Sequence, residues 1–450
     1  MRVKKILPVC FIILVCISAL VFFNNTPEES ELPMPCTISE VYYDSKTGMW
    51  ELEEDPYCSE QNTTVKRVYK DQHWTQDDAD FRLSVNLLKH GFTEKQKNII
   101  ISPFSIYLIT LLSANGAEGE TLTELQENIL SDLKYIDIED VNQRTEEYLN
   151  NLSPEVEINS SVWGGKFRYN YKKAVKPMTD IEPRPMNTRE FNRWISEKTH
   201  NRIHNLFSDQ TTEKNEFYIV NTASFKEQWN YAFKKKDTKE LPFYSLESEK
   251  PDMVPMMTAE QEILYAETEK MQAIMLYYQN GDFMQIFLPK PNIDFKKFII
   301  ELQTDDLDIA PANRRFGDLK NIENSEDTKT QLRYKLTSVR LYLPRFEIDN
   351  TFDKHIFESL NVSKIFTQYN KELLKMTNNP AYVKDIAHQA SIKVDEEGAF
   401  AETATTHIKE DKRRYEEYKK PIIFKADRPF VFMINNGLFI GAYTKGIMFQ

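Results

Sequence analysis

The sequence predicts an α+β fold in which helices pack on mostly antiparallel sheets. Apolar residues recur at helical spacing early in the chain, and Ser102-Pro103 is a typical helix start before one such run. Short runs rich in β-branched and aromatic residues follow later. The helical residues are Phe81, Val85 and Leu88, then Ile106, Ile109 and Leu112; the expected strands are 217–220, 283–288, 339–343, 422–424 and 430–434. Because the two kinds of element are segregated, repeated parallel βαβ units are not expected.

Composition indicates an ordinary globular body with an acidic balance. The 450 residues include 57 lysines and arginines against 69 acidic residues, a net charge of −12. Broad nucleic-acid binding requires clustered basic residues, so we expect no nucleic-acid partner. From residue 76 to residue 450 the pattern is globular, with no internal repeat and no linker rich in glycine, proline or serine. We therefore expect one domain over 76–450.

The first 23 residues are predicted to be a signal peptide or a signal anchor. Arg2, Lys4 and Lys5 precede an apolar run over 6–23, which is typical of secretory signals. Only Ser18 and Ala19 offer a small-residue cleavage site, and the run just reaches the length of a membrane span. We expect a secreted, extracellular protein. The alternative is a type II membrane anchor with the rest of the chain lumenal or extracellular, and only that alternative involves a membrane.

Residues 24–75 are predicted to be an acidic N-terminal extension. Between residues 24 and 60, ten acidic residues face the single cation Lys46, and such charge density opposes compaction. Tyr42 and Tyr43 lie among these acids, a setting that suits tyrosine sulfation and docking on a basic protein surface. A solvated acidic spacer is the simpler interpretation.

Export also bears on the cysteines and on glycosylation. Cys10 and Cys16 lie in the apolar run, so Cys36 and Cys58 are the only cysteines of the exported part. A disulfide between them would close a loop of about twenty residues and stabilise it by about 3 kcal/mol. Free or intermolecular thiols are the alternative. The glycosylation sequons are at Asn24, Asn62, Asn151, Asn159 and Asn361.

No catalytic motif is present in the sequence. There is no glycine-rich phosphate loop, no Gly-x-Ser-x-Gly turn and no His-Glu-x-x-His zinc helix, and residues 76–450 contain no cysteine. His200 and His204 are four residues apart but lack a third ligand nearby, so an exposed helix face is the simpler interpretation. We expect a protein that is not an enzyme and that uses no metal and no cofactor.

The segment 394–406 has the pattern of a buried strand within a loop-like composition. With a period of two, one face carries Ala399, Ala401, Thr403 and Thr405, and the other carries Phe400, Glu402, Ala404 and Thr406. A strand inserted into an existing sheet needs one face of small side chains, because packed neighbours leave little room. Gly398 gives a hinge before this strand, and 407–420 is a long polar stretch typical of an exposed loop. The pattern therefore indicates two conformations.

These residues, together with further motifs, resemble the serpin family of serine protease inhibitors over almost all of 76–450. The matches lie, in chain order, at 98–106, 116–121, 191–195, 220–226 with Trp229, 254–257, 343–346, 388–390, 428–432 and 439–441. The resemblance implies helices packed on three mostly antiparallel sheets with an exposed reactive-centre loop. It also implies a monomer that acts as a suicide substrate, with the cleaved loop inserting as a new strand.

The resemblance implies functional residues around this loop. The hinge residues would be Glu396, Glu397, Gly398, Ala399, Ala401, Thr403 and Thr405, and the reactive bond would follow Lys412, Arg413 or Arg414. A basic residue at this bond favours a trypsin-like protease as the partner. The loop is longer than usual for the family, so counting back from Pro429 instead puts the bond near Tyr418. Phe400 and this length keep a non-inhibitory serpin, serving as a carrier, storage or interaction protein, as the alternative.

Overall fold

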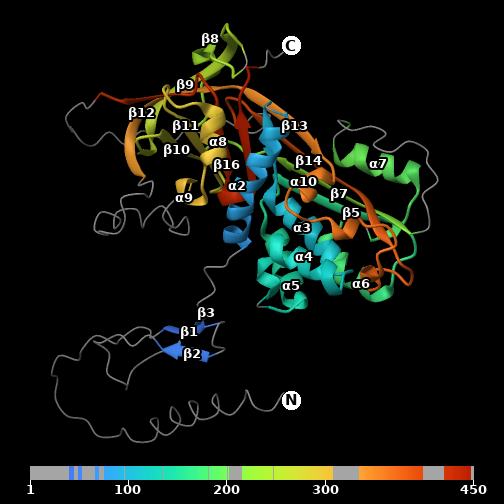
Figure 1. The fold of residues 1–450 in the computed structure, drawn as a ribbon. Helices are drawn as coiled ribbons and strands as arrows, with labels where there is room; N and C mark the ends of the chain where they lie inside the picture. Colours follow the sequence, from blue (N-terminus) through green and yellow to red (C-terminus); the bar gives the residue numbers. More distant parts are fainter. Residues whose placement is uncertain are drawn as a thin grey trace, which may run out of the picture. The chain divides into compact units, whose positions relative to one another are not determined.

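The computed structural model describes residues 40–44, 49–52, 66–69, 76–95, 97–134, 136–180, 182–199, 201, 215–246, 248–307, 334–398 and 420–446. The chain divides into two compact units, Met1–Gln72 and His73–Gln450 (Figure 1). The division falls near the predicted start of the globular body at residue 76.

The first unit contains a small sheet within the acidic extension. Its strands are β1 (Glu40–Asp44), β2 (Met49–Leu52) and β3 (Lys66–Tyr69), in the order β2-β1-β3. β1 pairs antiparallel with β2 and parallel with β3. The spacer interpretation did not include these strands. The predicted signal segment 1–23, Cys36, Cys58, Asn24 and Asn62 lie outside the described residues.

The second unit begins with helices, as predicted. The helices are α2 (Gln76–Lys95), α3 (Pro103–Ala114), α4 (Gly119–Asn128), α5 (Ile138–Asn151), α6 (Tyr169–Val175), α7 (Thr188–Lys198), α8 (Phe295–Glu301), α9 (Thr304–Leu307) and α10 (His355–Glu358). α3 begins where the sequence predicts a start: the Ser102 hydroxyl accepts a hydrogen bond from Ser105 N, and Pro103 occupies the first position. Every residue of α3 is buried, so it is a core helix rather than an amphipathic surface helix.

A five-stranded sheet carries the region of functional interest. Its strands are β5 (Val156–Gly164), β6 (Arg184–Pro185), β7 (Glu216–Phe225), β13 (Phe346–Phe352) and β14 (Tyr382–Val394), in the order β13-β14-β7-β5-β6. All ten residues of β7 are buried, because both faces of the sheet are covered there. β6 has only two residues and pairs with β5 only at Trp163 and Gly164.

The other strands form a nine-stranded sheet. They are β4 (Ile99–Ile101), β8 (Lys239–Phe243), β9 (Asp252–Glu267), β10 (Met271–Tyr277), β11 (Phe283–Pro289), β12 (Lys335–Pro344), β15 (Ile422–Lys425), β16 (Phe430–Ile434) and β17 (Phe439–Tyr443). The order is β15-β12-β9-β10-β11-β16-β17-β4, with β8 also on β9. One end of the long β9 pairs with β10 and the rest pairs with β12 and β8. β9 therefore joins two of the three expected sheets into one hydrogen-bonded path.

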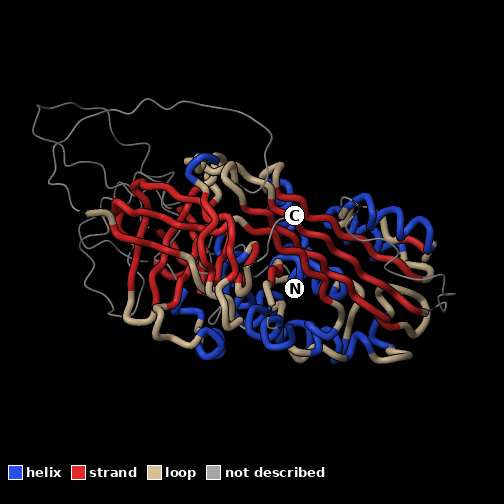
Figure 2. Tube along the Cα trace, turned by 90° about the horizontal axis from the view of Figure 1, so that it is seen from above, coloured by secondary structure: helices blue, strands red, loops and turns tan. Residues whose placement is uncertain are grey.

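Two hydrophobic cores lie on opposite faces of the five-stranded sheet. The main core fills the space between the two sheets and the helices, most of which gather on one side of the strands (Figure 2). α7 lies on the other side of β5 and β7 from α4 and α5 (Figure 1). Its cluster consists of Trp163, Phe191, Trp194, Ile195, Tyr218, Val220 and Ala387, with Met186 against it. This small cluster packs α7 on the sheet face, and Asp180 adds a hydrogen bond from Trp194 and an ion pair with Lys198.

Within the described ranges, no helix combines the length and the apolar character that crossing a membrane requires.

Replacing Trp194 by alanine is expected to open α7 locally without unfolding the main core. Loss of a buried tryptophan costs about 3–5 kcal/mol, and here the loss falls on the small cluster. Hydrogen exchange should therefore accelerate in α7 while β4 and α3 keep their protection. Phe104→Ala removes a ring from the main core and should lower the hydrogen-exchange protection of α7 as well as that of β4 and α3. Equal acceleration throughout the Trp194→Ala variant would contradict two separate cores.

Candidate functional site

The five-stranded sheet contains a long parallel pair with no strand between its members. β14 lies beside β7 from the pair Tyr382 and Glu216 to the pair Ile392 and Phe225. We call this boundary the seam. After β14 the chain turns back at residues 395–398, which we call the hinge turn. A strand formed after this turn would run antiparallel to β14 and therefore also to β7, so it can join both strands if they separate.

Gly398 is held against the end of β7. It forms an isolated antiparallel bridge with Gln228, just beyond the strand, at a φ of +144°. A Cβ at this position would lie 2.6 Å from Gln228 Cα and closer still to the carbonyl oxygen of Glu227. Both the backbone conformation and the space therefore require glycine. The antiparallel bridge is the first step of the pairing that a returning strand would continue.

The backbone of the hinge turn is fixed by the segment 229–233. Trp229 N donates to Glu397 O at 2.9 Å, and Phe233 N donates to Glu396 O at 2.8 Å. The indole Nε1 of Trp229 donates to Asp395 O at 3.0 Å. The Trp229 ring also stacks on Tyr278, with centroids 4.3 Å apart. Three hydrogen bonds thus connect the hinge turn to a segment that is itself anchored in the core.

Glu396 adds a buried ion pair to the hinge turn. Only 2% of this residue is exposed. Its Oε1 lies 2.5 Å from an Arg345 guanidinium nitrogen and accepts a hydrogen bond from Thr238 Oγ1 at 2.6 Å. Burial alone would raise the pKa of Glu396, but the hydrogen bonds from Thr238 and Arg345 outweigh burial and lower it. The neighbouring Glu397 pairs with the exposed Lys235, a contact of little energetic weight.

Glu227 is a second buried acid at the hinge, and its pKa is shifted in the opposite direction to that of Glu396. Its carboxylate accepts hydrogen bonds from Ser153 Oγ and from Asn280 Nδ2. Burial, together with the charges of Glu155 and Asp282, raises the pKa of Glu227 to about 7, although the Ser153 hydrogen bond acts in the other direction. The carboxylate side chain therefore titrates near neutral pH while its backbone contacts Gly398.

A buried histidine crosses the middle of the seam. His388 of β14 is 0% exposed, and its Nε2 accepts a hydrogen bond from Ser102 N at 3.2 Å. Its Nδ1 lies 3.1 Å from Asn221 Oδ1 of β7, and Asn221 Nδ2 donates to Ser160 Oγ of β5 at 2.9 Å. Burial lowers the pKa of His388 to about 3, so the ring is neutral and its Nδ1 carries the proton. These side chains connect three strands to the start of α3.

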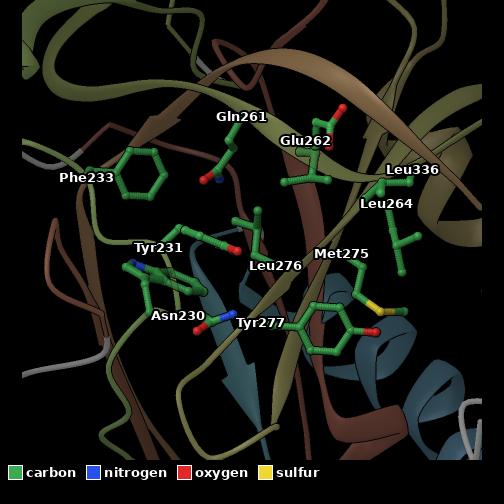
Figure 3. A pocket seen from close by; sticks show the side chains of 12 residues that line it. Asn230, Tyr231, Phe233, Gln261, Glu262, Leu264, Met275, Leu276, Tyr277 and Leu336 are labelled. Carbon is green, nitrogen blue, oxygen red and sulfur yellow. The ribbon is translucent and has the colours of Figure 1, made fainter. Parts of the chain in front are cut away.

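A hollow lies on the other side of the segment 229–233. It forms where β9 and β10 diverge and contains about 470 Å³ of empty space, part of it open to solvent. Figure 3 shows Phe233, Leu264, Leu276 and Tyr277 among the side chains around it. The segment that holds the hinge turn therefore also lines this hollow.

The described structure contains part of the predicted site. Glu396, Glu397 and Gly398 lie together in the hinge turn. The remaining predicted positions lie outside the described residues: Ala399, Ala401, Thr403, Thr405, Lys412, Arg413 and Arg414. The structure adds four residues that sequence reasoning did not single out for a role: Glu227, Trp229, Arg345 and His388. Trp229, Arg345 and His388 fell within recognised motifs, but nothing in the sequence indicates that Glu227 is buried.

Three of the predicted glycosylation sites lie in described segments. Asn151 is exposed at the end of α5, and Asn361 is exposed in a turn with a φ of +61°. Asn159 is half-buried within β5, with its Nδ2 3.5 Å from Thr222 Oγ1. Glycosylation at these positions stays a prediction. Across the described segments, no group of three or more histidines, cysteines or acids is arranged to bind a metal ion.

Comparison with known proteins identifies the family to which this seam and hinge belong. A family model described as serpin (serine protease inhibitor) matches residues 78–445. Iripin-2 of Ixodes ricinus is 24% identical, over 81% of this chain and 91% of its own length. Serpin A3-1 of Bos taurus is 26% identical, over 84% of this chain and 90% of its own length. The chain belongs to the serpin family. Serpins are in general protease inhibitors and not enzymes.

A solved structure agrees with the fold. The thermophilic serpin tengpin in its native state has a TM-score of 0.67 and 23% identity, covering 85% of this chain and 96% of its own. The predicted α+β serpin fold is confirmed by this likeness.

Stability is expected to fall as the pH rises through about 7 because of Glu227. The native pKa is raised, so the native state binds this proton more tightly than the unfolded chain. The resulting stabilisation is fully present below about pH 4.5, the ordinary value, and is lost as Glu227 ionises near pH 7. Melting temperatures of the wild type and Glu227→Gln should therefore coincide at about pH 4 and separate by a few degrees at about pH 8, with the wild type lower.

The matched control is Glu301→Gln, which removes an exposed carboxylate paired with Lys297 on α8. This variant should follow the wild type at both pH values. Parallel pH profiles of the wild type and Glu227→Gln would contradict a native-state role for this proton.

Proposed function

We propose that this protein inhibits a serine protease as a suicide substrate, and that the cleaved loop inserts into the seam between β7 and β14. Family membership supports protease inhibition in general. The observation that carries the specific mechanism is the parallel seam together with the antiparallel bridge between Gly398 and Gln228 at its end. A strand that continues from Gly398 already has its direction and its first pairing partner.

The register of this bridge supports insertion of the small-residue face toward the main core. Continued without a shift, it would set Ala401 opposite Phe225 and Thr403 opposite Ala223. Phe225 and Ala223 are almost fully buried and belong to the main core. The odd-numbered loop positions that the sequence shows to be small would therefore meet the tightly packed side, where larger groups would cost the most.

The same register also places Phe400, whose bulk counts against insertion of the loop. This residue would lie opposite Lys226, beyond the last residue of β7 and at the half-buried mouth of the seam. A bulky ring is tolerable there because few packed neighbours oppose it. A non-inhibitory serpin stays the alternative, but the position of Phe400 no longer favours it.

The energetic drive is the replacement of one parallel boundary by two antiparallel boundaries. An inserted strand gains backbone hydrogen bonds on both sides, each worth about 0.5–1.5 kcal/mol net. The uncleaved loop is tethered at both ends and is prevented from entering fully, so the native state is kinetically stable. Cleavage removes one tether. Insertion would then carry the acylated protease along with the loop.

We infer a trypsin-like target because Lys412, Arg413 and Arg414 stand where the family places the reactive bond. The alternative position near Tyr418 would suit a chymotrypsin-like protease. The export signals support a secreted protein with a disulfide between Cys36 and Cys58 and glycans at the sequons, and family membership supports a monomer. An uncleaved type II anchor is the alternative.

The test is incubation with trypsin followed by denaturing electrophoresis. The wild type should form a complex that survives boiling in detergent. Thr403→Arg puts a charge on the core-facing side of the inserted strand and should turn the protein into a substrate that is only cleaved. Glu402→Arg is the matched control, because its register partner Ser224 lies on the other face, so this variant should still form complexes.

Melting curves before and after loop cleavage separate inhibition from the alternative. Insertion should raise the melting temperature of the cleaved wild type strongly. Cleavage without either a complex or a raised melting temperature would overturn the proposal and favour a non-inhibitory serpin.

A further inference from the structure

The end of the seam far from the hinge carries a buried carboxylate that bonds across both strands. Glu216, the first residue of β7, is 5% exposed. Lys384 Nζ donates to its Oε1 at 2.7 Å, and Tyr382 OH donates to the same oxygen at 2.8 Å. Tyr218 OH donates to Oε2 at 3.4 Å. We call Glu216, Tyr382 and Lys384 the clasp, because two donors from β14 meet one acceptor from β7.

A β-bulge brings both donors of β14 to the same acceptor. The register between β7 and β14 shifts between Val383 and Asp385, so Lys384 is the extra residue. Bulges redirect side chains in this way and are typical of specialised positions. Tyr382 also lies directly opposite Glu216 in the register. The clasp is therefore a local departure from regular pairing.

The protonation states keep the clasp formed at neutral pH. The hydrogen bond to Glu216 raises the pKa of Lys384, which stays a cation. Burial, together with the Glu216 charge, raises the pKa of Tyr218 to about 12, and burial with the Glu216 hydrogen bond also raises that of Tyr382. All three donors therefore keep their protons. Opening the clasp would leave a carboxylate in a buried setting without them, which is costly.

We propose that the clasp brakes the last stage of loop insertion, because it must open before an inserted strand can occupy the far end of the seam. This inference rests on the proposed function. Insertion separates β7 from β14 along the register that ends at Glu216 and Tyr382. Every contact between Glu216 and β14 is therefore lost on complete insertion.

The loop sequence strengthens the brake. Continuing the register from the bridge between Gly398 and Gln228 puts Glu410 opposite Glu216. Two acids directly opposite each other on neighbouring strands repel. Two pairs earlier, on the same face of the inserted strand, Ile408 would lie opposite Tyr218, which belongs to the apolar cluster under α7. Insertion as far as Ile408 thus gains apolar contact, whereas the next step breaks the clasp and opposes two carboxylates.

The experiment anneals synthetic loop peptides to the intact full-length protein, so it needs no protease. One peptide spans 399–408 and stops before the clasp; the other spans 399–412 and passes it. Uptake is followed by native electrophoresis and by the rise in melting temperature. The wild type should bind the longer peptide at least about tenfold more slowly than the shorter one, the size expected for hydrogen bonds to a charged group. In Glu216→Gln this difference should disappear.

A second variant and two controls make the result specific. Tyr382→Phe keeps the fold while removing one donor, and should reduce the difference in part. A 399–412 peptide with Glu410→Gln should anneal faster to the wild type than the natural peptide, but should gain nothing in Glu216→Gln. Glu260→Gln removes an acid that pairs with Arg340 across β9 and β12, strands that stay together, and should keep the wild-type difference.

The outcomes separate this inference from the proposed function. An unchanged length dependence in Glu216→Gln, with both peptides annealing, would overturn the clasp and leave insertion intact. Failure of both peptides to anneal to any variant would overturn insertion into the seam, and the clasp with it.

Discussion

The pairing of β7 with β14 is the constraint on which the rest of the molecule depends. Parallel pairing is slightly weaker per residue than antiparallel pairing, and here it runs through a sheet that is covered on both faces. From the pair His388 and Asn221 to the pair Ser391 and Ser224 the side chains along it are small or polar, with Thr222 beside Gln389. Small polar groups interlock less than large apolar ones, so the two strands can part without dismantling the core.

Specific polar contacts stabilise the seam in addition to the packing of apolar residues such as Ile219 and Ile386. The hinge turn is held by Trp229 and by the ion pair of Glu396 with Arg345. The middle is joined by His388 and Asn221, and the far end by the clasp at Glu216. Buried polar contacts of this kind are strong when complete and costly when broken. They give the closed sheet a barrier against opening even where an open sheet with one more strand would be more stable.

The sequence was sufficient to predict the fold class, because motifs spread over 98–441 had to occur in one order. It also predicted the start of α3, since Ser102 and Pro103 act locally. The face of small side chains in the loop could be predicted because a period of two residues is common to all strands. In each case the signal lies in neighbouring residues, and no distant partner has to be known.

The polar contacts of the seam could not be predicted in the same way. Glu216 and Lys384 are separated by more than 160 residues and look like ordinary surface charges. Their meeting depends on the parallel register and on a bulge, neither of which leaves a local pattern. Glu227 likewise follows a strand as an unremarkable acid, and its burial depends on Ser153 and Asn280 arriving from other elements. Periodicity in the sequence does not show which residues of two distant strands are paired, so these contacts could not be predicted from it.

The two acids at the hinge act in opposite senses, and their difference follows from their partners. Glu396 meets a guanidinium, so its charge stabilises the closed hinge turn. Glu227 is buried and faces the charges of Glu155 and Asp282, so ionisation of its carboxyl destabilises the native state. Both lie within a few residues of the contact between Gly398 and Gln228. At neutral pH Glu396 thus holds the hinge turn through Arg345, whereas Glu227, with a pKa of about 7, is partly ionised, so a rise in pH destabilises the segment that Gly398 contacts while the ion pair of Glu396 persists.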